Sequence, residues 1–154
     1  MPVKNASGST EKVRVVVFDA GPVTWAVDLS HVREIVRIKG LTILPNAIPE
    51  VVGMVNIRGD VVPVINSWWN GDGPDDFDKI MVMEWNGELL GLGIDSVRGI
   101  DAVHGVRYGD EVLGSTVKFR VDLTHLKDIP LLDIKPLIEN FKNRPAVMEQ
   151  GLGI

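Results

Sequence analysis

The sequence predicts a mainly β fold, arranged as two small barrels or as a sandwich. The first observation is that short apolar runs, rich in β-branched residues, alternate with turn residues along most of the chain. The second is the number of these runs, about nine or ten in roughly 130 ordered residues, which is typical of small barrels and sandwiches. The third is the scarcity of helical periodicity, because only one or two short stretches have it.

The chain opens with two runs that predict a pair of strands. Val13–Phe18 is apolar at nearly every position, as expected for a strand that is buried on both faces. Asp19-Ala20-Gly21-Pro22 predicts a turn, because Gly and Pro are strong turn formers. Val23–Val27 is then the returning strand.

Two stretches have the pattern of short helices. Leu29–Ile38 could be helical, with Ser30 as its cap. Its apolar stripe would consist of Val32, Ile35 and Val36. Ile134–Phe141 predicts a closing helix, provided that Pro136 lies in its first turn.

Two hairpins are expected in the middle of the chain. Val51–Ile57 and Val61–Ile65 flank Arg58-Gly59-Asp60, which suits a three-residue loop with a central Gly. Pro63 should restrict the second of these strands to an edge or a bulge, because proline has no N–H to donate. The clearest hairpin joins Ile80–Trp85 to Glu88–Ile94.

Turn chemistry supports that second hairpin and a late pair of strands. Asn86-Gly87 allows the positive φ angles that a type I′ turn requires. Val117–Leu123 and Ile129–Ile134 predict two further strands around Lys127-Asp128.

Length and composition limit the organisation of the chain and its classes of function. At 154 residues with 45% hydrophobic residues, the chain is long enough for a single domain with a sizeable core, which we place at residues 11–142. Residues 1–10 and 143–154 have the composition of tails. The net charge of -5 argues against binding to nucleic acid. No signal peptide or membrane-spanning run is present in the sequence, so we expect a cytoplasmic protein.

Metal and nucleotide sites find little support. The chain has no cysteine, and its three histidines, His31, His104 and His125, lack the spacing of metal ligands. The acidic segment from Asp72 to Asp78 fails the spacing of a calcium loop and predicts a solvated loop. Gly91-Leu92-Gly93 lies within a strand, where glycine favours close backbone approach or a bulge over nucleotide binding.

Arginine and tryptophan supply the candidate binding residues. Arg58 either faces solvent at its hairpin tip or offers a planar guanidinium to a partner. Trp68 and Trp69 are adjacent, so on a strand they point to opposite faces. One of them is therefore either partly exposed or covered by a partner, and tryptophan is enriched at binding hot spots.

Several stretches, taken in order, carry a resemblance to a known family. The most specific runs from Leu44 to Ile65 and contains Asn56-Ile57-Arg58-Gly59 followed by Pro63. The others are Val15–Val27, Val32-Arg33-Glu34-Ile35, Gly91–Val97 and Ile129–Ile134. Over about Val13–Phe141 the sequence resembles the CheW-like coupling proteins of bacterial chemotaxis.

The resemblance implies a fold and a function. Members of this family are not enzymes and adopt two small five-stranded β-barrels that share a hydrophobic core. They bridge the cytoplasmic tips of methyl-accepting chemoreceptors to the regulatory domain of the histidine kinase CheA. The resemblance therefore implies a cytoplasmic adaptor that is recruited to membrane-associated receptor arrays without inserting into the membrane. It implies no cofactor and no metal.

The resemblance also assigns roles to individual residues. Arg58 would be the family's functional arginine, at or near the receptor contact. Asn56 and Gly59 would hold its turn, and Glu34 would lie near the partner surface. Trp68 and Trp69 follow Ser67 where the family usually has an aspartate-leucine-arginine type of segment, and we include both in the receptor- or kinase-binding set.

Two alternatives remain open beside this reading of the sequence. The chain could be a CheW-like adaptor of another two-component or motility pathway. A small β-barrel enzyme would need a pocket with convergent titratable groups, and Asp95, Glu34 and His31 around one cavity would support that alternative.

Overall fold

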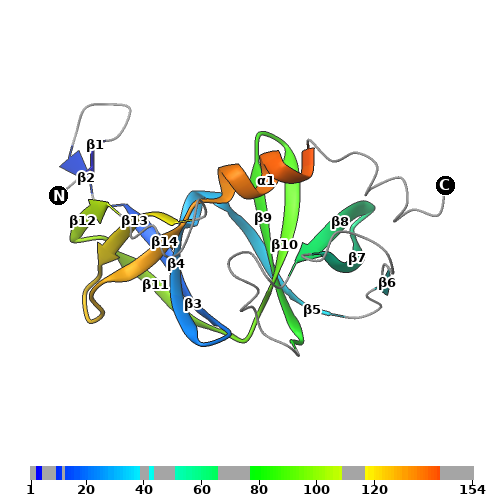
Figure 1. Cartoon of the computed structure of the whole chain (residues 1–154), viewed down its shortest axis with the longest axis horizontal. Coiled ribbons are helices and arrows are strands. Elements are labelled where there is room, and N and C mark those ends of the chain that lie inside the picture. Colours follow the sequence, from blue (N-terminus) through cyan, green and yellow to red (C-terminus); the bar gives the residue numbers. More distant parts are fainter. Residues whose placement is uncertain are drawn as a thin grey trace.

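The computed structural model of the chain describes residues 3–4, 10–11, 13–38, 42–43, 51–65, 77–108 and 117–142. These residues are mostly strands, with one short 3-10 helix and one α-helix among them. The predicted mainly β fold class is confirmed. The strands form two large sheets that lie side by side as two lobes (Figure 1).

The first lobe is a six-stranded sheet of order β11-β3-β4-β14-β13-β12. Its neighbours are antiparallel, except that β14 runs parallel to β4. The strands are β3 (Arg14–Ala20), β4 (Val23–Asp28), β11 (Ser96–Ala102), β12 (Gly105–Tyr108), β13 (Val117–Asp122) and β14 (Ile129–Leu132).

The second lobe is a six-stranded sheet of order β5-β9-β10-β8-β7-β6, in which β10 and β8 are parallel. Each sheet thus has six strands where five were expected per barrel. The strands are β5 (Val32–Arg37), β6 (Thr42–Ile43), β7 (Val51–Ile57), β8 (Asp60–Ile65), β9 (Lys79–Trp85) and β10 (Glu88–Ile94). A separate two-stranded pair joins β1 (Val3–Lys4) to β2 (Thr10–Glu11).

The central strands are buried on both faces, which explains their continuous apolar runs. In β3, Val15 and Val17 point into the core of the first lobe, whereas Val16 and Phe18 point into a core shared by both lobes. In β9, alternate residues divide in the same way between the second lobe and the shared core. Because successive strand residues face opposite sides, a strand with a core on each side has no polar alternation.

Helix α1 (Ile134–Lys142) closes the shared core. It runs from the first lobe across to β9 and β10 of the second (Figure 1). Ile134, Leu137 and Ile138 are buried on the side that faces the sheets. Pro136 is its third residue, so the predicted position in the first turn is confirmed.

The expected helix at Leu29–Ile38 is wrong beyond its first turn. A 3-10 helix, η1 (Leu29–His31), is followed directly by β5. Its cap is Asp28, whose side chain accepts a hydrogen bond from the Ser30 N–H at 2.9 Å, and not Ser30 itself. The β-branched residues after it pair with β9 instead, and this pairing overrides a helix-like spacing.

The hairpin β7–β8 also differs from its prediction. Ile57 pairs with Asp60, so the loop has two residues, Arg58 and Gly59, in place of three. Strand β8 lies between β7 and β10, so its placement at an edge is wrong. The sheet accommodates Pro63 because β8 pairs with β10 only at Val64 and Ile65, beyond the proline.

The remaining hairpin and glycine predictions agree with the structure. Asn86 and Gly87 have φ angles of 52° and 79° and join β9 to β10 as a two-residue turn. A Cβ added to Gly91 would lie 2.7 Å from Ile80 Cγ2, and one added to Gly93 would meet the Phe77 ring. These glycines therefore permit close packing, as expected.

Some predictions fall on residues outside the described ranges. These include Trp68 and Trp69, the acidic segment from Asp72 to Asp76, and the proposed tail at residues 143–154. In the described part of the chain, no helix is long and apolar enough to span a bilayer.

Candidate functional site

The turn between β7 and β8 presents Arg58 at the surface of the second lobe. Arg58 and Gly59 have φ angles of 52° and 90°, the positive values of a type I′ turn. The Gly59 N–H donates a hydrogen bond to the Asn56 side-chain oxygen at 3.0 Å. Asn56 and Gly59 thus fix the backbone of the turn locally, as the family resemblance implied.

Arg58 forms an ion pair with Glu34 of β5. Arg58 Nη1 donates to Glu34 Oε2 at 2.5 Å, across 24 residues of sequence. In the order of the sheet, β5 is separated from β8 by β9 and β10. The ion pair therefore links two elements that are not neighbours in the sheet, and Val82 of β9 and Leu89 of β10 line the space beneath it.

The two partners of this ion pair differ sharply in exposure. The Arg58 side chain is 75% exposed, whereas that of Glu34 is 17% exposed. Beneath them lies a narrow pocket of about 10 Å³, whose apolar walls include Ile57, Val82 and Leu89. Glu34 is therefore a partly buried anchor, and Arg58 is the part of the site that solvent or a partner can reach.

The structure brings together four of the six predicted site residues. Arg58, Asn56, Gly59 and Glu34 form one cluster, while Trp68 and Trp69 lie outside the described residues. The direct contact between Arg58 and Glu34 was not predicted, since it joins elements that are separated by two strands in the sheet.

The three residues of the enzyme alternative line different hollows. Glu34 lines the pocket beneath the ion pair, and His31 lines an open hollow with Arg33 and Trp85. Asp95 lies in a third hollow beside Phe77. The hollows lined by the described residues thus do not bring these three side chains together.

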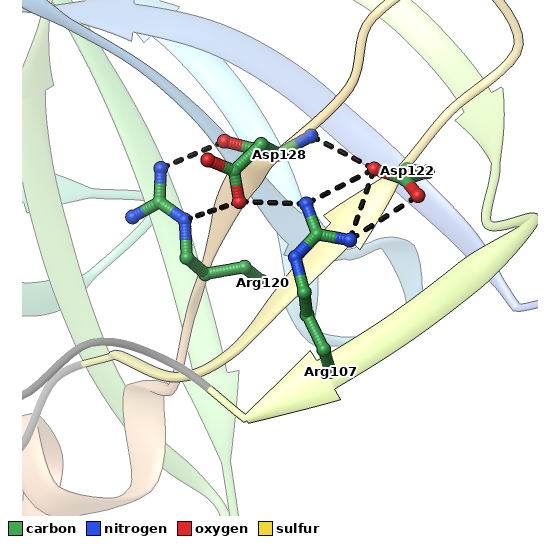
Figure 2. A network of polar contacts seen from close by, with 4 residues as sticks. All are labelled: Arg107, Arg120, Asp122 and Asp128. Carbon is green, nitrogen blue, oxygen red and sulfur yellow. Dashed lines mark hydrogen bonds and ion pairs between the residues drawn. The ribbon is translucent and has the colours of Figure 1, made fainter.

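A second polar cluster lies on the first lobe (Figure 2). Arg107 of β12 and Arg120 of β13 are directly opposite each other in the strand register. Asp128 Oδ1 accepts from Arg107 Nη2 at 2.6 Å and from Arg120 Nε at 2.8 Å. Asp122 accepts from both terminal nitrogens of Arg107. The two carboxylates thereby offset the repulsion between two adjacent cations.

This cluster fixes the connection between β13 and β14. Asp128 has a φ of 59°. This left-handed conformation is energetically unfavourable for a residue that carries a side chain. Its N–H donates to Asp122 at 2.9 Å, and its carbonyl accepts from Arg120 at 2.7 Å. Hydrogen bonds from Arg107 lower the pKa of both carboxyls, with Arg120 contributing at Asp128. We interpret the cluster as structural.

A third cluster ties β11 to the β3–β4 hairpin. Arg98 Nε donates to Asp19 at 3.0 Å, and the Thr24 hydroxyl donates to the same carboxylate at 2.6 Å. Partial burial acts to raise the pKa of Asp19, but the hydrogen bonds from Arg98 and Thr24 outweigh it and lower this pKa. Asp95 accepts from the Gly21 N–H at 2.9 Å.

Histidine does not contribute to a metal site in the described residues. Within these ranges, no group of three or more His, Cys, Asp or Glu side chains is placed to hold a metal ion. His104 Nε2 lies 3.2 Å from the Thr124 hydroxyl, which in turn donates to Asp101. The hydrogen bond from Thr124 lowers the pKa of Asp101.

Comparisons with known proteins agree on one family. A family model described as the CheW-like domain matches residues 14–141. The chemotaxis protein CheW of Treponema pallidum (strain Nichols) is 32% identical over 56 residues, which cover 36% of this chain and 33% of the relative. The match thus spans about a third of that relative's length. The scaffolding protein TtCheW from Thermoanaerobacter tengcongensis has the same fold, with a TM-score of 0.70 at 22% identity over 80% of this chain and 90% of that structure.

Proposed function

This chain belongs to the CheW-like domain family, and on that premise we propose that it is a scaffolding adaptor of chemotaxis. It couples methyl-accepting chemoreceptors to the histidine kinase CheA by binding both at once. The observation that carries the proposal is the exposed guanidinium of Arg58, which is held on a two-residue turn by the partly buried Glu34.

The function we propose consists of binding, without catalysis or a cofactor. An adaptor that contacts receptor and kinase together transmits a signal when one arrangement of the complex is favoured over another. The chain would work in the cytoplasm, at receptor arrays on the membrane surface. Its relationship to a protein named as a scaffold supports this role.

Arg58 suits a binding anchor on physical grounds. Arginine is enriched at hot spots, because its planar group combines charge, several donors and a large contact surface. A side chain already held by an ion pair loses less conformational entropy on binding than a free one. The fixed turn and Glu34 therefore prepare Arg58 for contact.

The proposal is tested by reversing the charge of Arg58. We expect Arg58→Glu to weaken binding to a soluble receptor-tip fragment or to the CheA regulatory domain by about tenfold or more, because a hot-spot residue is lost. Arg37→Glu is the matched control, since Arg37 is on the same lobe, is also 75% exposed and also forms an ion pair. Isothermal titration against each partner measures both variants.

The control and the kinase assay decide the result. Loss of binding in Arg58→Glu alone, with an unchanged melting temperature, supports the proposal. Equal affinities for the wild type and Arg58→Glu, together with unchanged receptor control of the kinase, would refute it. If the chain binds the kinase of another two-component pathway and not CheA, the adaptor role stands and the chemotaxis assignment is wrong.

A further inference from the structure

Strand β11 is an edge strand of the first lobe and carries two exposed apolar side chains. Among the described strands it pairs with β3 alone. Val97 and Ile100 are 36% and 54% exposed, although they lie opposite Phe18 and Val16, whose side chains fill the shared core. A bulge before Gly99, which has a φ of 137°, shifts the register between them. Val97 and Ile100 therefore share one face of β11 although they are three residues apart.

The backbone direction of β11 follows from its bonds to β3. The Val103 N–H donates to the Val13 carbonyl at 2.8 Å, so the backbone groups of Val103 face β3. Residues of an antiparallel pair alternate between facing their partner strand and facing away from it. Ala102 and Ile100 therefore face away from β3. The Ala102 N–H is already bonded to Asp101 Oδ1 at 2.7 Å, so an added strand finds no free donor there.

The bulge gives Val97 the same backbone direction as Ile100. Val97 lies opposite Phe18 and Ile100 lies opposite Val16, and these two residues of β3 are two positions apart. Positions two apart along a strand face the same way, so both Val97 and Ile100 turn their N–H and C=O groups outward. The two residues with exposed apolar side chains are thus also the two to which a further strand can be added.

We propose that this edge of β11 pairs with the same edge of a second copy of the chain, about a twofold axis between Arg98 and Gly99. In this antiparallel register, Val97 of each copy lies opposite Ile100 of the other. Each pair exchanges two backbone hydrogen bonds, and the four apolar side chains meet on one face. The second copy is the occupant because the two outward positions become each other's partners under the rotation.

The charges near the axis permit this contact. Arg98 Nε donates to both oxygens of Asp19, at 3.2 and 3.0 Å, so each arginine is neutralised within its own copy. Lys and Pro, which commonly block the pairing of edge strands, do not occur between Ser96 and Ala102. Two residue pairs make a small interface, so we expect a weak dimer, with a dissociation constant on the order of 0.1–1 mM.

Engineered cysteines test the register, because the chain has no cysteine of its own. Val97→Cys and Ile100→Cys are prepared separately and then mixed under mild oxidation. We expect the mixed disulfide dimer to exceed both homodimers several-fold, since residues paired across the axis have Cα atoms about 5.5 Å apart, within the reach of a disulfide. Mass spectrometry distinguishes the three products. A statistical mixture of them would overturn the proposed twofold pairing.

Sedimentation equilibrium at up to about 1 mM measures self-association without any engineered cysteine. The average mass of the wild type should rise with concentration, whereas Ile100→Lys should remain a monomer because a charge on the edge opposes pairing. Ile35→Lys is the matched control, since Ile35 is 41% exposed on β5, an edge strand of the other lobe. It should associate like the wild type.

The measurement uses the chain alone, so its outcome is independent of the proposed function. A wild type that stays monomeric at about 1 mM overturns the inference, and so does equal association of the wild type and Ile100→Lys. If the wild type stays monomeric and Ile100→Lys weakens binding to the receptor-tip fragment or to the CheA regulatory domain, the edge belongs to that partner and not to a second copy.

Discussion

Replacing Arg58 by asparagine should separate the stability of the protein from its binding. The substitution gives the β7–β8 turn the same residues as the β9–β10 turn, Asn followed by Gly, at the same φ of 52°. Relief of the left-handed strain should stabilise the fold by about 1 kcal/mol. Loss of an ion pair whose arginine is 75% exposed should cost about 0–1 kcal/mol, because solvent screens such pairs.

The two effects nearly cancel, so we expect a free energy of unfolding within about 1 kcal/mol of the wild type. For a chain of this length, that corresponds to a change in melting temperature of at most about 2–4 °C. Binding to the receptor tip or to the kinase should still fall by about tenfold or more, because the guanidinium is gone. Calorimetric unfolding and titration of the same preparation measure the two quantities.

Asn86→Arg is the reciprocal control. It introduces arginine at the same φ in the other two-residue turn of the second lobe, so it should lower stability by about 1 kcal/mol and leave binding intact. The reasoning fails if Arg58→Asn lowers the melting temperature by about 8 °C or more. That shift is far larger than the expected one, so Arg58 would then have a structural role in the fold. It also fails if Arg58→Asn binds like the wild type.

Two further predictions concern stability. Gly91→Ala should destabilise the fold by about 1–3 kcal/mol, because its Cβ would lie 2.7 Å from Ile80 Cγ2 in a packed interior. Glu88→Ala, at the exposed end of β10, is the control and should change the free energy of unfolding little. Chemical denaturation compares the two variants. The pKa values of Asp122 and Asp128 are lowered in the folded state, so their stabilising effect is present above their unfolded pKa of about 4 and is lost as the pH falls through their folded pKa. Asp128→Asn should therefore be less stable than the wild type at pH 7 and lose less stability on acidification, and parallel stability curves from pH 7 to pH 2 would contradict this.

The sequence predicts best those elements whose pattern is set by a core on each side. Val13–Phe18 and the hairpin around Asn86-Gly87 were identified because their residues leave few alternatives to a buried strand and a type I′ turn. Strands β11 and β12 were not predicted. Residues 96–100 are exposed and carry no apolar alternation, so only pairing with β3 makes them a strand.

Tertiary contacts account for the predictions that differ. Val32, Ile35 and Val36 fit a helical stripe by spacing, but β9 offers them a partner strand, and β-branched residues favour that arrangement. Gly59 could be assigned to the turn from its residue type, whereas the role of Asn56 came from the family resemblance, although its hydrogen bond with Gly59 closes within four residues. The pairing of Arg58 with Glu34 could not be predicted, because it joins a turn to a strand that is two strands away in the sheet.

The double burial of the central strands also explains where a partner can bind. Residues on both faces of β3, β4, β9 and β10 are committed to one of the cores, so these strands offer little surface for recognition. Among the described residues, turns and edge strands face solvent without weakening a core. Arg58 is on a turn and Glu34 is on the edge strand β5. A substitution at Arg58 should therefore change what the protein binds and leave its folding nearly unaffected.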